Sequence, residues 1–228
     1  MKKLITPFVA IALFFACTPS TNSGAGNGAD YKKLYEKSIA MKDYQTAISA
    51  IQLILLSDST NGLRDSLPEL FGAVNNVQAC LASVNESLKR YPTDEKFLNI
   101  KLICLQETGE VDEQFNLLSN LYKSTAKVQY IAQIASIQVA TGNLKDARQT
   151  IDNILLNYKG SKETLEVFAD ERTKQMVPVE AAAWNMLGFV YMQQKNLEKA
   201  KECYFKALEI YPDFAMPKRN LDLIFSRK

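Results

Sequence analysis

The residues of this chain that could do chemistry are few, and two of its four cysteines are spaced so that they could meet. Cys80 and Cys104 each lie twelve positions from Pro92, and proline ends helices because it lacks a backbone donor. Two helices running antiparallel about that turn would hold both sulfurs at a similar height. The spacing fits a disulfide, which needs Cα atoms within about 7 Å. Both cysteines also lie on apolar stripes, which favours two buried thiols that pack as small apolar groups.

Other catalytic and metal-binding groups are scarce. The sequence contains no histidine, which excludes catalysis through an imidazole and removes the commonest transition-metal ligand. No cysteines form a C-x-x-C pair, so zinc and thiol-redox patterns are missing. Asp170 and Glu171 could act as paired carboxylates, but neighbours on a helix diverge and make poor partners. We therefore expect no catalytic residue, no metal, no cofactor and no enzyme activity.

The charge balance gives no sign of a nucleic-acid partner. The chain has 27 Lys and Arg against 25 Asp and Glu, and Lys2 and Lys3 account for the difference. Recognition of nucleic acid needs a concentrated basic face. We therefore expect no nucleic-acid partner.

Two stripes of apolar and small residues organise residues 181–214. The first stripe has the spacing i, i+3, i+4, i+7 and the second has i, i+4, i+7, which is typical of amphipathic helices. Pro212 ends the second helix. The stripes are Trp184, Leu187, Gly188 and Tyr191, then Ala200, Tyr204 and Ala207. We expect two antiparallel helices whose small residues, Gly188 and Ala200, let the backbones approach closely.

This stretch resembles the tetratricopeptide repeat, a 34-residue signature of Trp, Leu-Gly, Tyr, Ala, an aromatic residue, Ala and Pro at fixed offsets. Every position matches, with Tyr204 in place of the usual Phe. Weaker copies precede it in residues 28–61, 61–94, 95–127 and 128–160. The resemblance implies that residues 30–228 fold as an all-α, right-handed solenoid of about five helical hairpins with a C-terminal capping helix.

Two local features carry further expectations. Ser66 is expected to cap a shortened first helix in the second repeat, with Glu69 completing a capping box. Residues 161–180 then interrupt the period, and Ser161 could cap a short helix carrying Leu165, Phe168 and Met176. This segment is either a mere insertion or a part of the chain that shapes the binding site.

The N-terminus resembles a bacterial lipoprotein signal. Two lysines and an apolar run too short to span a bilayer precede Ala16-Cys17, which resembles the lipobox, although Phe14 stands where Leu is more usual. We predict a signal peptide at 1–16, with Cys17 lipidated and residues 17–29 forming a flexible Gly/Ser-rich tether. The alternatives are an ordinary signal peptide cleaved further on, and a chance cysteine.

The family resemblance also implies a binding groove on the concave face, lined by set positions of the first helices. In the last two repeats these positions include Ala182, Asn185, Phe189, Met192 and Gln193, and Gln129 and Ser136. The groove would be neutral and partly apolar, and it lacks the family's clamp for a terminal carboxylate. It would suit an extended peptide or an amphipathic helix, unless Phe189 and Met192 pack against 161–180 instead.

Together the two resemblances imply a non-catalytic scaffold that binds a protein partner in this groove. Thr18 after the cysteine favours an outer-membrane lipoprotein, and the absence of an acidic run favours the periplasmic face. Envelope assembly is one role of such proteins. The alternative is a lipid-anchored binding protein for a small ligand or glycan. That function would need exposed aromatic residues around one pocket, whereas Trp184, Tyr191 and Tyr204 are explained by repeat packing.

Overall fold

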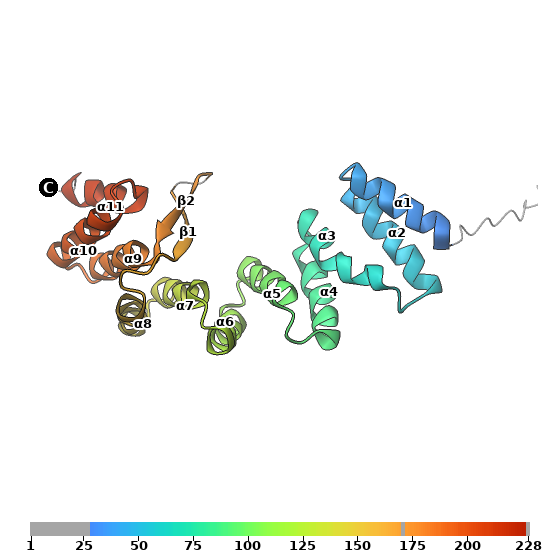
Figure 1. Cartoon of the computed structure of the whole chain (residues 1–228), viewed down its shortest axis with the longest axis horizontal. Helices are drawn as coiled ribbons and strands as arrows, with labels where there is room; N and C mark the ends of the chain where they lie inside the picture. Colours follow the sequence, from blue (N-terminus) through green and yellow to red (C-terminus); the bar gives the residue numbers. More distant parts are fainter. Residues whose placement is uncertain (1–27, 170–171, 227–228) are drawn as a thin grey trace, which may run out of the picture. The chain divides into compact units, whose positions relative to one another are not determined.

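The computed structural model describes residues 28–169 and 172–226. The predicted signal peptide, Cys17 and residues 17–27 of the tether lie outside the described residues, as do Asp170 and Glu171. The described chain consists of α-helices that follow one another as antiparallel pairs, with one β-hairpin between the fourth and fifth pairs (Figure 1). It divides into two compact units after Asn61.

The first unit is a single helical hairpin of α1 (Gly28–Ala40) and α2 (Tyr44–Ser57). Lys42 has a positive φ of 58° in the turn. Asp43 then caps α2 by accepting a hydrogen bond from the backbone of Thr46 at 3.1 Å, which satisfies a donor that the helix itself leaves free. The buried face of α2 includes Ile51 and Ile54, as expected for the second helix of a repeat.

The second unit contains the remaining pairs. After a 3₁₀ helix at Gly62–Ser66, its elements are α3 (Leu67–Ala73), α4 (Val77–Arg90), α5 (Glu95–Thr108), α6 (Val111–Thr125), α7 (Val128–Ala140), α8 (Leu144–Asn157), β1 (Thr164–Phe168), β2 (Lys174–Pro178), α9 (Val179–Gln193), α10 (Leu197–Ile210) and α11 (Ala215–Ser226). Each predicted repeat range holds one helical pair, and α11 follows the last. The structure confirms an all-α array of helical hairpins.

In the turns inside three of the five pairs, the left-handed backbone conformation falls on glycine or asparagine. Gly109 and Gly142 have φ values of 75° and 78°, and Asn75 has 56°, a region that glycine and asparagine adopt most readily. In two of the five turns, the asparagine that follows the left-handed residue caps the next helix. Asn76 accepts from the backbone of Ala79, and Asn196 from that of Lys199, both at 3.2 Å.

The predicted helix in residues 161–180 is wrong, because the segment forms a β-hairpin. Strand β1 pairs antiparallel with β2, and Glu166 lies opposite Met176. In β1 the half-buried Leu165 and Val167 alternate with exposed neighbours, which is the period of a strand and not of a helix. The Ser161 hydroxyl accepts from the backbone of Glu163 at 3.1 Å and so forms a turn.

The predicted cap at Ser66 is also wrong. Ser66 has helical φ and ψ of −87° and −15°, and its side chain makes no capping bond. The reason is that the 3₁₀ helix runs up to Ser66, so this residue lies inside a helical run and not before one. Glu69, expected to complete the capping box, forms an ion pair with Lys96 at 3.0 Å.

Candidate functional site

Two adjoining clefts are lined by the first helices of the last two pairs, α7 and α9. Their volumes are about 650 and 640 Å³, and both are lined by Ser136 of α7, Asn185 and Met186 of α9, and Met216 of α11. A third cleft of about 450 Å³ lies between α5, α6 and α7 and again includes Ser136. We call the first two clefts together the α7–α9 groove. Ser136 stands where all three clefts meet.

Six of the seven residues predicted to line a groove do line these clefts. Gln129 and Ala182 contribute to the 640 Å³ cleft, Phe189 and Gln193 to the 650 Å³ cleft, and Ser136 and Asn185 to both. The structure therefore brings these side chains together on one surface. Whether a partner binds there stays a prediction.

Met192, the seventh residue, lies outside the groove. Its sulfur is 3.9 Å from the Tyr204 hydroxyl, and it packs against the core that α7 to α11 share. It lines a smaller cleft with Leu197 of α10 and with Leu223 and Ile224 of α11. Because the capping helix approaches this end of α9, the position faces other helices instead of the groove.

Asn185 is the most buried polar residue of the groove, with 5% of its surface exposed. Its side-chain oxygen accepts a hydrogen bond from Asn220 of α11 at 3.4 Å, which gives a buried polar group the partner that it needs. The Ser136 hydroxyl donates to the carbonyl of Ala132 at 3.0 Å, within its own helix. Both side chains are therefore held in place from within the array.

The sequence left open whether residues 161–180 shape the binding site, and it gave α11 no place there; in the structure strand β1 and helix α11 are two walls of the groove. All five residues of β1 line the 640 Å³ cleft, and Asn220 of α11 lines its neighbour. The alternation of polar and apolar residues from Thr164 to Val167 is compatible with a strand, but it is too short to exclude a helix. Nothing in the local sequence of α11 indicates that it lines the groove.

Polar contacts hold the hairpin against α11. Gln175 of β2 donates to the carbonyl of Asp213 at 2.9 Å and accepts from the backbone of Ala215 at 3.1 Å. Arg219 of α11 donates to the carbonyl of Ala169 at 2.7 Å. Leu165 and Val167 contribute apolar packing beneath the hairpin. The wall formed by β1 is therefore fixed to the array on two sides.

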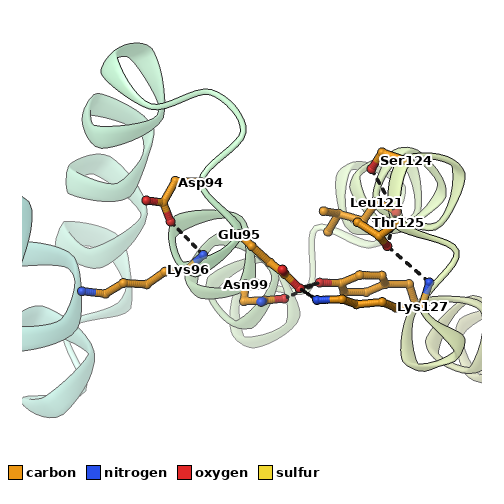
Figure 2. A network of polar contacts seen from close by, with 9 residues as sticks. Asp94, Glu95, Lys96, Asn99, Leu121, Ser124, Thr125 and Lys127 are labelled. Atoms are coloured by element: carbon orange, nitrogen blue, oxygen red, sulfur yellow. Dashed lines mark hydrogen bonds and ion pairs between the residues drawn. The ribbon is translucent and has the colours of Figure 1, made fainter.

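A polar network joins α7 to α5, the first helix of the preceding pair (Figure 2). Lys127 and the hydroxyl of Tyr130 both donate to the carboxylate of Glu95, the latter at 2.8 Å, and that hydroxyl also lies 3.2 Å from the Asn99 side-chain oxygen. The hydrogen bond from Lys127, followed by that from Tyr130, holds the pKa of Glu95 below its ordinary value. The network links successive first helices.

Replacing Glu95 with glutamine is expected to lower stability at neutral pH and to matter less in acid. Because the folded pKa lies below the ordinary 4.5, the ionised carboxylate stabilises the fold above that pH, and this contribution is lost as the pH falls through the lowered folded value. Urea unfolding of the variant and the unaltered protein, at pH 7 and in acid, measures the loss of stability under each condition. Glu202→Gln on the exposed face of α10 is the control, and an unchanged Glu95→Gln midpoint at pH 7 would contradict the expectation.

The two cysteines singled out by their spacing lie against each other. Cys80 and Cys104 are buried free thiols whose sulfurs are 3.0 Å apart. The Cys80 thiol is also 3.2 Å from the carbonyl of Pro68. Burial, followed by the contact with Cys80, raises the pKa of Cys104 to about 12, and burial raises that of Cys203 to about 11. A disulfide between Cys80 and Cys104 stays a prediction.

We expect the thiols of Cys104 and Cys203 to resist labelling in the native protein. At pH 8 a thiol of pKa about 11 is roughly one-thousandth thiolate, and only the thiolate reacts. A thiol-reactive chromophore added to a Cys17→Ser variant should label these cysteines only after unfolding. Rapid labelling of the native chain would contradict their burial, and an intact mass two hydrogens lower would reveal the disulfide.

Trp184, Tyr191 and Tyr204, the three aromatic residues weighed for a glycan or small-ligand site, are taken up by packing. Tyr191 and Tyr204 are buried in the core that α7 to α11 share. Lys206 covers the ring of Trp184, with its ammonium 4.2 Å from the centroid. None of the three lines the α7–α9 groove. They therefore do not supply the exposed aromatic cluster that a glycan or small-ligand site would need.

Within residues 28–169 and 172–226, no group of three or more His, Cys, Asp or Glu side chains is arranged to hold a metal ion. In the same ranges no helix combines the length and the apolar character needed to cross a membrane.

One contact inside the last pair is as close as the sequence predicted. A Cβ atom added to Gly188 of α9 would lie 2.5, 2.7 and 3.0 Å from three ring atoms of Tyr204 of α10, and that tyrosine is 0% exposed. Residues 181–214 also match the family model described as "Tetratricopeptide repeat". This chain carries a tetratricopeptide repeat. The tetratricopeptide repeat comprises α9, α10 and the turn that joins them.

Comparison with solved structures extends the likeness from one tetratricopeptide repeat to most of the chain. No curated protein matches this sequence. A crystal structure of MamA has a TM-score of 0.58 at 15% identity and covers 80% of this chain and 90% of its own. MamA from Desulfovibrio magneticus RS-1 has a TM-score of 0.56 at 12% sequence identity, and the match covers 82% of this chain and 96% of that one. YrrB is described as a TPR protein with an unusual peptide-binding site. Its structure has a TM-score of 0.59 at 14% sequence identity, and the match covers 86% of this chain and 92% of that one. These likenesses show a common fold.

Proposed function

We propose that this protein is a non-catalytic scaffold that binds a segment of a partner protein in the α7–α9 groove. The observation that carries the proposal is that Ser136 and Asn185, on successive first helices, line two adjoining clefts of about 650 and 640 Å³. A continuous surface across successive repeats is the part of a helical repeat array that binds extended partners.

The lining of the groove favours an uncharged guest with apolar side chains. Among the described residues that line it, Glu166 alone is charged, and that carboxylate forms an ion pair with Lys174 at 2.6 Å. Met186 and Met216 supply flexible apolar surface, while Gln129, Gln193 and other amides supply donors and acceptors. A terminal carboxylate or an acidic tail would find no cationic partner in this lining.

The solved structure of YrrB supports a peptide guest in this architecture. That protein is described as having an unusual peptide-binding site. Because identity is 14%, the likeness carries over the fold and none of its binding residues. The groove of the present chain is therefore argued from its own side chains.

A second part of the proposal concerns location. The lipobox-like Ala16-Cys17 and the small, polar residues after it support lipidation at Cys17, with a tether leading to the repeats. Such a protein would be held at the periplasmic face of the outer membrane. Metabolic labelling with an alkyne fatty acid tests this part, and labelling that persists in a Cys17→Ala variant would contradict it.

Photo-crosslinking in living cells tests the binding site. A photoreactive amino acid replaces Ser136 or Phe189 in the groove, and Ser49 on α2 serves as the control position. We expect both groove positions to trap the same protein and Ser49 not to trap it. Equal yields from all three positions would refute a groove-specific partner. Groove positions that trap no protein, in a chain intact at the membrane, would favour the small-ligand or glycan alternative.

A further inference from the structure

The β-hairpin presents an unpaired strand edge to the groove. Two bonds flank its ladder, from Val179 N–H to the carbonyl of Glu163 at 3.0 Å and from Ala169 N–H to that of Thr173 at 2.8 Å. Along a strand of an antiparallel pair, the backbone N–H and C=O groups bond to the partner strand at every second residue and point away from it at the residues between. We call these the inward and the outward positions. With the register of Glu166 opposite Met176, the inward positions of β1 are therefore 165 and 167, and the outward ones are 164, 166 and 168.

The position of Pro178 agrees with this assignment. Pro178 lies opposite Thr164, at an outward position of β2 where no backbone donor is needed, and edge strands accept proline at such positions. The backbone groups of Thr164, Glu166 and Phe168 form no hydrogen bond to another described residue. They make a row of free donors and acceptors along one side of β1.

This free edge lies at the 640 Å³ cleft. Every residue of β1 lines that cleft, whichever face of the hairpin its side chain is on. Strand β2 contributes Met176 alone. A strand that exposes both kinds of residue to one cavity meets it edge-on. Figure 1 shows the hairpin in orange beside α9, with which both strands are in contact.

The part of the cleft lining that α7 contributes is suited to a peptide backbone as well. Gln129, Gln133 and Ser136 of α7 line the same cleft, and their amides and hydroxyl can both donate and accept hydrogen bonds. Ala182 and Met186 of α9 add apolar surface to the same cleft. The charge of Glu166 is balanced by Lys174, so nothing in the lining selects for a charged guest.

We propose that the guest binds as an extended strand paired with the free edge of β1, and that it is an uncharged segment of the partner with apolar side chains at alternate positions. The inference rests on the proposed function and specifies how the groove holds its partner. An unpaired edge is a template for a further strand, and such addition takes affinity from main-chain bonds and specificity from alternate side chains. Five residues of β1 offer about 17 Å of edge.

Two proline variants test the edge without touching the bonds inside the hairpin. Glu166→Pro removes an outward donor from the edge of β1 that faces the groove. Lys174→Pro removes an outward donor from the far edge of β2, opposite Phe168. Both lose the same ion pair between Glu166 and Lys174, so they are closely matched. Glu166→Gln loses that ion pair and keeps the donor.

The probe is the tightest peptide selected from a random twelve-residue display library panned on the protein. We expect Glu166→Pro to weaken its binding about fivefold to tenfold, the effect of one lost hydrogen bond together with the bulk of the ring. Lys174→Pro and Glu166→Gln should bind within about twofold of the unaltered protein. N-methylation along the peptide should weaken binding most at alternate residues, those whose amides face β1.

The outcomes separate this inference from the proposed function. If no peptide is selected, or if binding is unaffected by blocking the groove at Ser136, the proposed function fails. If the peptide needs the groove but tolerates Glu166→Pro and shows no alternation on N-methylation, the strand inference fails and the groove remains. A dimer that Glu166→Pro dissociates would assign the edge to a second copy of this chain and overturn the inference.

Discussion

Replacing Gly188 with leucine is expected to destabilise the second unit by about 3 kcal/mol, the upper end of the cost of overpacking. Even a single Cβ atom there would lie 2.5 Å from the Tyr204 ring. That ring is fully buried and has no room to move aside. Gly188→Ala should also destabilise, by about 1 kcal/mol net, because the overpacking exceeds the gain of about 1 kcal/mol in helix propensity.

Gly72→Ala is the matched control, since it places the same methyl group at another helical glycine. Its nearest neighbour would be the sulfur of Cys80 at 3.9 Å, an ordinary van der Waals contact. We expect Gly72→Ala to stabilise by about 0.5–1 kcal/mol. Urea unfolding measures both variants. If they shift the midpoint in the same direction, or if Gly188→Leu leaves it unchanged, the packing of α9 on α10 is described wrongly.

Ser136→Trp is expected to weaken binding of the partner segment at least tenfold, or about 1.4 kcal/mol. Ser136 lies at the meeting point of three clefts, so an indole there would occupy space in all of them. The residue is exposed, and stability should therefore change little. Fluorescence anisotropy with the segment recovered by crosslinking measures the affinity.

Ser49→Trp provides the control for that change. Ser49 is likewise an exposed helical serine, and its hydroxyl donates to the carbonyl four residues earlier, at Gln45, as that of Ser136 does at Ala132. It lies on α2, away from the groove residues in sequence and in the other unit. Equal losses from Ser136→Trp and Ser49→Trp would place the binding site elsewhere.

The repeat packing could be predicted from the sequence because it depends on residue types at fixed spacing. The close crossing of α9 and α10 requires a small residue at position 188 opposite the aromatic ring at 204, and the structure has that contact. The groove positions of α7 and α9 came from the resemblance to the tetratricopeptide repeat, whose first helices line its concave face at set positions. Met192 was assigned wrongly because its surroundings depend on α11, which the spacing does not describe.

The hairpin could not be predicted with the same means. Leu165 and Phe168 are three residues apart, a spacing that suits one turn of helix, while Leu165 and Val167 suit a strand. Five residues are too few for periodicity to decide between the two. The contacts that settle it come from distant residues, such as the bonds from Gln175 to the backbone at 213 and 215. The edge of β1 and its place in the lining of the groove were therefore visible only in the folded chain.

The central claim, that a partner segment occupies the α7–α9 groove, is tested most directly by methionine methyl NMR. Met186 and Met216 line both clefts, whereas Met192 packs elsewhere and Met41 is 70% exposed in the first unit. On addition of the segment recovered by crosslinking, we expect the methyl signals of Met186 and Met216 to shift and that of Met41 to stay. A bound segment that leaves both groove signals unmoved would contradict the account.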